Sequence, residues 1–310
     1  MLLRIATIAF NTYRESVRAR ILYGLLALAL ATALYSIAVG AFALKSSARV
    51  VSDLGGASIS LYAILVSVVI SGTSLYREVE QKTIFPVLAR PIRRGEYLVG
   101  KYLGTLLTLL VFIAFDAGAC LLIVAAMAGR AVVLVAAVGL AAPLFLALGA
   151  WKFPRSATLL PAPVALLVAV SGALLASAAP DEQRVVMGMA ALALLEVGIV
   201  AAFATLFASF SSPFLSAVFT LGLWLVGRSA DTLASMPEKT FGPAIQKVCG
   251  VVSHVVPNLQ VYVPPRPLLT GETSGHLLST HLAMASLQSV AWAVGLLALS
   301  SVVFRRRDFL

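Results

Sequence analysis

The chain has 310 residues, of which 60% are hydrophobic and only 12% are charged, and its mean hydropathy is +0.99. Because soluble domains carry about 25% charged residues, this composition excludes an ordinary soluble protein and indicates a surface that faces lipid. The net charge of +10 does not indicate nucleic-acid binding, since most of the basic residues gather between apolar stretches.

The first predicted element is an amphipathic helix over residues 2–18. At about 100° per residue, its apolar and polar side chains separate onto two faces. The apolar face holds Leu2, Leu3, Ile5, Ala6, Ala9, Phe10, Tyr13 and Val17, and the polar face holds Arg4, Thr7, Asn11, Arg14, Glu15 and Arg18. Such a helix typically lies in the membrane interface, so residues 1–20 form the first predicted unit. A cytosolic extension of the first span is the alternative.

Eight apolar stretches follow, each near the roughly 20 residues that a helix needs to cross a bilayer. A backbone in lipid must satisfy its own hydrogen bonds, so these stretches are predicted to be helices. They cover residues 21–43, 57–75, 102–127, 131–150, 157–179, 186–208, 212–228 and 282–303. Pro143, Pro161 and Pro163 interrupt the fourth and fifth stretches, which could instead form one hairpin that does not fully cross. The predicted fold is an all-α polytopic membrane protein with about eight, or else six, transmembrane helices.

The distribution of lysine and arginine predicts the orientation of the chain. With the N-terminus in the cytoplasm, the cytoplasmic segments hold 15 of the 23 basic residues and the outer segments hold the other eight. This bias predicts that both termini are cytoplasmic, which requires an even number of spans.

Residues 229–281 form the one sizeable segment between predicted spans, and a short amphipathic helix is expected over 241–256. The segment is expected on the extracytoplasmic side, where it could meet a periplasmic partner or substrate. It separates the transmembrane region, residues 21–228, from the last span and basic tail, residues 282–310. Its histidines and Cys249 lack the spacing of a metal site.

Two acidic residues, Asp116 and Glu196, lie inside predicted spans. An aspartate at mid-span costs about 2.5–3.5 kcal/mol on insertion scales, so such groups normally face a cavity or a partner. Asp116 and Glu196 are therefore candidates for an intramembrane polar path, or else they hydrogen-bond to neighbouring helices. No basic residue is expected deep in a span to pair with them.

The sequence contains neither the G-x-x-x-x-G-K-[ST] phosphate loop nor the H-E-x-x-H motif. We therefore expect no direct binding of ATP, a metal ion or another cofactor, and no catalytic residues. An intramembrane enzyme, the competing class, would need paired acids at one depth, and only Asp116 and Glu196 could supply them.

The most informative stretch is a charged loop predicted over residues 76–101. It mixes acids, bases and apolar side chains, whereas a loop that only touched lipid would need only the bases. The mixture favours a short element that docks on a protein partner, and Pro86 and Pro91 restrict any helix within it to short pieces. On spacing alone, a solvated loop without a partner is an equal alternative.

This stretch resembles the cytoplasmic loop of ABC-2 type permeases, in the branch that includes the nitrous-oxide-reductase maturation and gliding-motility transporters. The pattern is R-E-x-E-x-x-T-I-x-x-L-L-x-R-P-x-x-R-x-E-x-x-x-G-K. The positions that fall on it are Arg77, Glu78, Glu80, Thr83, Ile84, Leu88, Arg90, Pro91, Arg94, Glu96, Gly100 and Lys101. Residues 9–18, 207–214, 257–259 and 304–309 also resemble the family. Two departures are Pro86, where a helix former is more usual, and residues 131–180, which resemble a two-span insertion into a six-span pattern.

The resemblance implies a permease subunit in the bacterial cytoplasmic (inner) membrane, surrounded by membrane lipid and coupled to a separate ABC ATPase that binds ATP and magnesium. It implies a second permease copy, either identical or related, and it favours export. The residues that it assigns to ATPase coupling are Glu78, Glu80, Thr83, Ile84, Leu88, Arg90, Pro91 and Arg94. An anchor that transmits ATPase movement to an extracytoplasmic partner, without transport, is the alternative.

Overall fold

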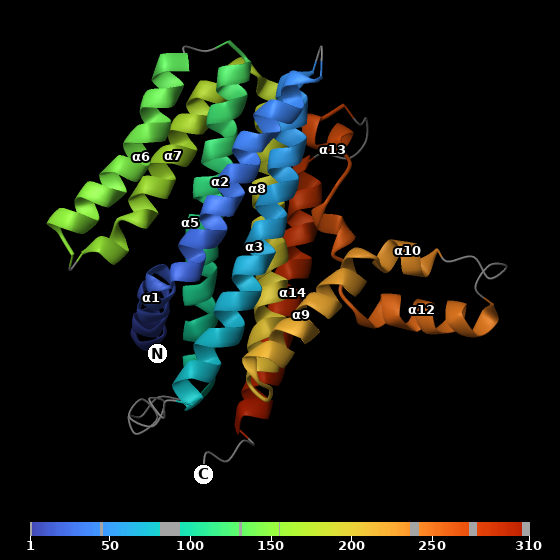
Figure 1. The fold of residues 1–310 in the computed structure, drawn as a ribbon. Helices are drawn as coiled ribbons and strands as arrows, with labels where there is room; N and C mark the ends of the chain where they lie inside the picture. Colours follow the sequence, from blue (N-terminus) through green and yellow to red (C-terminus); the bar gives the residue numbers. More distant parts are fainter. Residues whose placement is uncertain are drawn as a thin grey trace.

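The computed structural model describes residues 2–43, 46–80, 94–129, 132–154, 156–235, 242–272 and 278–305. Within these ranges the chain is almost entirely helical and contains no β-strand, so the predicted all-α class is confirmed (Figure 1). The elements are α1 (Leu2–Arg18), α2 (Arg20–Ala41), α3 (Ser47–Glu80), α5 (Arg94–Met127), α6 (Val132–Lys152), η1 (Ala157–Leu159), α7 (Pro161–Leu175), η2 (Ala176–Ala178), α8 (Pro180–Ala208), α9 (Pro213–Arg228), α10 (Ala230–Ala234), α12 (Pro243–Val255), η3 (Gln260–Tyr262), α13 (Arg266–Thr270) and α14 (Leu278–Arg305).

Each predicted apolar stretch is helical, and the described part of the chain contains seven helices long and apolar enough to cross a membrane. These are α2, α3, α5, α6, α7 with its flanking 3-10 turns, α8 and α14. The stretches interrupted by proline therefore form two separate long helices. The remaining helix, α9, has 16 residues, or about 24 Å at 1.5 Å per residue, which is short of a roughly 30 Å hydrocarbon core.

The bundle has two distinct ends, which Figure 1 shows as bottom and top. One end carries both chain termini, the last turns of α3 and the first turns of α5, and we call it the terminal end. The far end carries the connections from α2 to α3, α5 to α6 and α7 to α8. Helix α1 is seen almost along its axis, so it lies across the direction of the bundle helices near the terminal end.

Helices α3, α5 and α8 form the centre of the bundle, and apolar side chains along all three are buried. Small residues let these helices approach closely, as expected for packing in lipid, where apolar burial gives no driving force between helices. A Cβ on Gly55 of α3 would lie 2.9 Å from Sγ of Cys120 in α5, and a Cβ on Gly56 would lie 3.0 Å from Cγ of Met189 in α8.

Helices α6 and α7 form a hairpin at one side of the bundle, and only α7 is packed tightly (Figure 1). A Cβ on Gly118 of α5 would lie 2.7 Å from the carbonyl carbon of Val168, and one on Gly172 of α7 would lie 2.6 Å from the carbonyl oxygen of Gly118. These glycines let α5 and α7 touch through their backbones. Helix α6 exposes most of its surface, with only Val135 and Ala142 buried.

The segment predicted to be extracytoplasmic has two parts. Helices α10 and α12 extend sideways from the bundle, and α12 covers most of the helix expected over residues 241–256 (Figure 1). The following part returns to the bundle, where the amide of Leu259 donates to the carbonyl of Gly227 at 3.0 Å. The hydroxyl of Tyr262 donates to the carbonyl of Ala285 in α14 at 3.1 Å.

Candidate functional site

The predicted coupling segment lies between α3 and α5 at the terminal end. Glu78 and Glu80 are in the last turn of α3, and Arg94 is the first residue of α5. The other coupling candidates lie outside the described residues: Thr83, Ile84, Leu88, Arg90 and Pro91. The predicted loop over 76–101 is wrong in its extent, because α3 continues to residue 80 and α5 begins at residue 94. The loop bounds are predicted from the first charged residues beside each apolar stretch. Such residues mark where the chain leaves the lipid, but the helix itself can continue beyond that point.

The start of α5 is joined to the end of α14. Nη1 of Arg94 donates to the carbonyl of Phe304 at 3.1 Å, and the rings of Tyr97 and Phe304 stack with centroids 6.5 Å apart. A Cβ on Gly95 would lie 3.1 Å from Oγ of Ser301, so the glycine leaves room for this α14 side chain. The helix that leaves the coupling segment is therefore fastened to the last helix of the chain.

The start of α5 is also joined to α1 through two glycines one helical turn apart. A Cβ on Gly100 would lie 2.7 Å from Cβ of Ile8, and one on Gly104 would lie 2.4 Å from the carbonyl oxygen of Ala9. Any larger side chain would push α1 away from α5. Gly100 belongs to the family-like pattern, and the structure gives it a packing role.

Lys101 strengthens this contact between α1 and α5. Its Nζ lies 4.0 Å from Oε2 of Glu15 in α1 and 5.8 Å from the centroid of the Tyr97 ring. The Lys101 side chain is almost fully buried, whereas that of Glu15 is partly exposed. The contact therefore places a largely desolvated cation between α1 and α5.

The predicted apolar face of α1 is divided between two surroundings. Ile5, Tyr13 and Val17 are buried together with Thr12 and Ser16, and Leu2, Leu3 and Phe10 are exposed. Small polar side chains join the buried side because α1 packs against the glycines of α5. The exposed apolar residues at the start of α1 remain available to lipid.

Asp116 is fully buried in α5, and neither of its carboxylate oxygens has a hydrogen-bond partner among the described residues. Burying an ionised carboxylate without donors is very costly, so the site favours a neutral group.

Glu196 in α8 is fully buried too, but it accepts four hydrogen bonds. Arg228 of α9 donates from Nε at 2.7 Å and from Nη2 at 2.9 Å, Trp224 donates from Nε1 at 3.0 Å, and Ser60 of α3 donates at 3.0 Å. Nη2 of Arg228 also donates to Oγ of Ser60 at 2.7 Å, which closes the network.

The expectation that no basic residue would pair with the two acids is therefore wrong for Glu196. Arg228 ends α9, and because this helix is short, its last residue reaches Glu196 within the bundle rather than the outer surface. No hydrogen bond connects Glu196 with Asp116 among the described residues, and the intramembrane polar path through these two acids stays a prediction.

Comparison with protein families matches residues 6–309 to the family described as ABC-2 family transporter protein. This match spans nearly the whole chain, including most of α1, the coupling segment and α14. The chain belongs to the ABC-2 transporter family. It is a multi-pass membrane component of an ABC transporter, and comparison with curated proteins found no match.

The far end of this ABC-2 chain carries an ionic cluster that the sequence did not predict. Arg266 of α13 donates to Asp53 of α3 and to Glu182 of α8, and its Nη1 donates to Oγ of Ser52 at 3.2 Å. Ser52 in turn donates to Oε2 of Glu182 at 2.6 Å. Burial alone would lower the pKa of Arg266, but Glu182 and Asp53 outweigh it and raise that pKa, so the guanidinium stays charged.

The described part of the ABC-2 chain contains no group of three or more histidine, cysteine, aspartate or glutamate side chains that could hold a metal ion. Of the three histidines, His281 is placed with its side chain, and its Nε2 lies 2.9 Å from the carbonyl oxygen of Val261. This contact ties the final helix to the segment before it.

Proposed function

We propose that this chain is the permease subunit that couples ATP hydrolysis by a separate ABC ATPase to export of a substrate. The observation that carries the proposal is the junction at the start of α5. The predicted coupling segment leads directly into a helix whose first three turns contact both α1 and the end of α14.

The junction supports the proposal because it can pass on a movement. A pull on the first residue of α5 acts on the Phe304 carbonyl through Arg94 and on α1 through Gly100 and Gly104. Interiors packed this closely move as units, because a shift of one ångström would create clashes or voids. Movement of the ATPase would therefore reach several helices at once.

The proposed orientation places the terminal end, with both termini, in the cytoplasm of a bacterium. The excess of basic residues in the corresponding segments supports it. The proposed assembly contains two permease copies, identical or related, and two ATPases, with ATP and magnesium bound by the ATPases. Glu78, Glu80 and Arg94 would orient the contact by charge complementarity.

The test is co-expression of the chain with candidate ABC ATPases from the same genome, then purification through the permease and measurement of ATP hydrolysis in proteoliposomes. We expect the ATPase to co-purify. The triple exchange Glu78→Gln, Glu80→Gln and Arg94→Gln is expected to lower both co-purification and ATP hydrolysis.

The matched control is Arg184→Gln, which removes one charge from the far end, where the Arg184 side chain is 61% exposed. It should leave both measurements unchanged. The proposal fails if the purified chain retains no ATPase and the triple exchange leaves ATP hydrolysis unchanged. ATP hydrolysis that depends on the permease, without vectorial release of any substrate, would identify the anchor function instead.

A further inference from the structure

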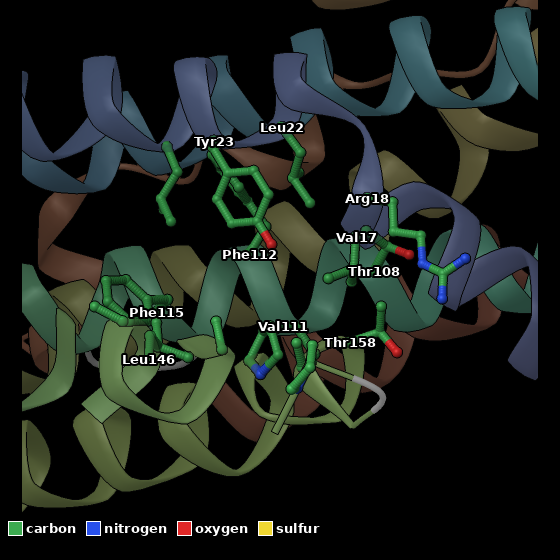
Figure 2. A pocket seen from close by; sticks show the side chains of 16 residues that line it. Val17, Arg18, Leu22, Tyr23, Thr108, Val111, Phe112, Phe115, Leu146 and Thr158 are labelled. Carbon is green, nitrogen blue, oxygen red and sulfur yellow. The ribbon is translucent and has the colours of Figure 1, made fainter. Parts of the chain in front are cut away.

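A cavity of about 530 Å³ lies between the junction of α1 and α2, the middle of α5, and the hairpin formed by α6 and α7 (Figure 2). Its volume is within the range of about 300–1,000 Å³ that ligand sites occupy. Most of its walls are apolar, and Leu22, Phe112, Phe115 and Leu146 contribute large side chains. The part contributed by α5 extends from Thr108 to Phe115, or about 10 Å along the helix axis.

The arrangement of the hairpin keeps this cavity open. Gly118 and Gly172 hold α7 directly against α5, whereas α6 leans away from the bundle and exposes most of its surface. On that side Leu146 is the one large side chain of α6 in the lining, and the small residues Ala147, Ala150 and Ala157 leave the rest of the space unfilled. The space is therefore a consequence of the fold.

The cavity has one cationic end. Figure 2 shows Arg18 at the end near Val17 and Thr158, and Phe115 and Leu146 at the opposite end. Arg18 is exposed, and within the described part of the chain it forms no salt bridge or hydrogen bond.

A second, more polar hollow of about 510 Å³ adjoins the cavity at Arg18. It is lined by Asn11, Arg14, Glu15, Arg18 and Ala19, so Arg18 borders both spaces. Nε of Arg14 donates to Oγ1 of Thr158 at 3.3 Å, which places a second guanidinium beside the cavity mouth. Glu15, the acid in this hollow, faces Lys101 at 4.0 Å, so the local charge of the two arginines remains positive.

We propose that the two spaces together bind one anionic phospholipid, with an acyl chain in the apolar cavity and the phosphate headgroup at Arg14 and Arg18. A soluble anion would not need the apolar cavity, and a neutral apolar molecule would not need the arginines. Basic pockets between transmembrane helices are typical sites for anionic headgroups. Tyr23, Ala147 and Ala150 are exposed at the cavity wall, which leaves a route from the surrounding lipid.

This proposal does not rest on coupling to an ATPase, so it can be tested on the purified full-length chain. The chain, in neutral detergent, would be titrated with phosphatidylglycerol or phosphatidylcholine, and bound lipid counted by native mass spectrometry. We expect one saturable site per chain that prefers phosphatidylglycerol. Arg14→Gln and Arg18→Gln should each weaken phosphatidylglycerol binding about fivefold, the effect of one basic residue near anionic lipid, without changing phosphatidylcholine binding.

Two further variants make the test specific. Arg20→Gln removes the same charge two residues from Arg18. Arg20 lines neither the cavity nor the polar hollow but a third hollow against α3, which Arg18 also borders, so binding should change less than twofold. Ala147→Phe fills the apolar cavity from the exposed helix α6 and should weaken the binding of both lipids. Equal affinity of the wild-type chain for the two lipids would overturn the proposal. So would an equal effect of Arg20→Gln and Arg18→Gln, or unchanged binding in Ala147→Phe.

Discussion

Replacing Arg228 with methionine is expected to destabilise the bundle more than replacing Glu196 with glutamine. The Glu196 side chain is 0% exposed and that of Arg228 is 22% exposed, so the two members of the pair differ in access to solvent. Arg228→Met leaves a buried carboxylate with only Trp224 and Ser60 as donors. Removing one partner of a buried ion pair typically costs about 3–5 kcal/mol.

Glu196→Gln leaves the opposite situation. The amide keeps the shape of the carboxyl group and can still accept from Trp224 or Arg228, while the partly exposed guanidinium can turn toward solvent. Glu196→Gln therefore removes only charge-assisted hydrogen bonds, which lowers the free energy of unfolding by about 1.5–3 kcal/mol. The double variant Glu196→Leu with Arg228→Leu removes both charges and should recover much of the loss of Arg228→Met, because an apolar pair avoids the desolvation cost.

The assay is thermal unfolding in detergent, and unfolding is monitored through the reaction of Cys120 with a thiol-specific fluorescent dye. Cys120 is fully buried in the core, so it reacts when the bundle opens, and Cys249→Ser in the background removes the more accessible thiol. Arg184→Met, an exposed change on the same helix as Glu196, is the control and should shift stability by less than about 0.5 kcal/mol. The reasoning is refuted if Glu196→Gln lowers the unfolding temperature at least as much as Arg228→Met does. It is also refuted if the double variant is no more stable than Arg228→Met.

Three other changes have defined outcomes. Gly104→Leu should separate α1 from α5 and abolish permease-dependent ATP hydrolysis. The control Gly139→Leu should leave this hydrolysis unchanged, because nothing lies within 4 Å of a Cβ at that position. Equal ATP hydrolysis in the two variants would contradict transmission through α1. Arg266→Met should lower the free energy of unfolding by about 2 kcal/mol, because Asp53 and Glu182 lose the cation that they share. It should also speed amide hydrogen exchange over residues 266–270. Unchanged exchange would show that the cluster does not hold α13. Asp116→Asn should keep or raise the melting temperature, since a neutral amide avoids burying a charge without donors; a loss above about 2 kcal/mol would reveal an essential carboxylate.

The helices could be predicted from the sequence because each needs about 20 apolar residues, and this requirement is local. The ends of α3 and α5 could not, since hydropathy marks where a chain leaves lipid and not where its hydrogen bonds stop. Both helices continue to the edges of the coupling segment, at Glu80 and Arg94.

The polar contacts depend on which helices are neighbours, and no local pattern carries that information. Arg228 follows Glu196 by 32 residues and lies on a different helix, and Arg266 is 213 residues from Asp53. The shortness of the stretch over 212–228 was a usable signal, because a helix too short to cross leaves its terminal charge within the bundle, where that charge needs a partner.

The same geometry gives the hairpin of α6 and α7, predicted from the sequence to be a two-span insertion, a mechanical role that its sequence does not show. Gly118 lies about four helical turns beyond the α1 contact at Gly104 on the same helix, and it holds α7 by backbone contact. If α5 moves as a rigid rod when its first residue is pulled, α7 must follow, while the loosely packed α6 is free to lag behind. The cavity that α5 and α6 both line would then change volume with each ATPase cycle, because one wall moves with α5 and the other belongs to the loosely packed α6. A lipid in that cavity would resist the change, so the occupancy of the site and the rate of ATP hydrolysis should be linked in proteoliposomes of defined phosphatidylglycerol content.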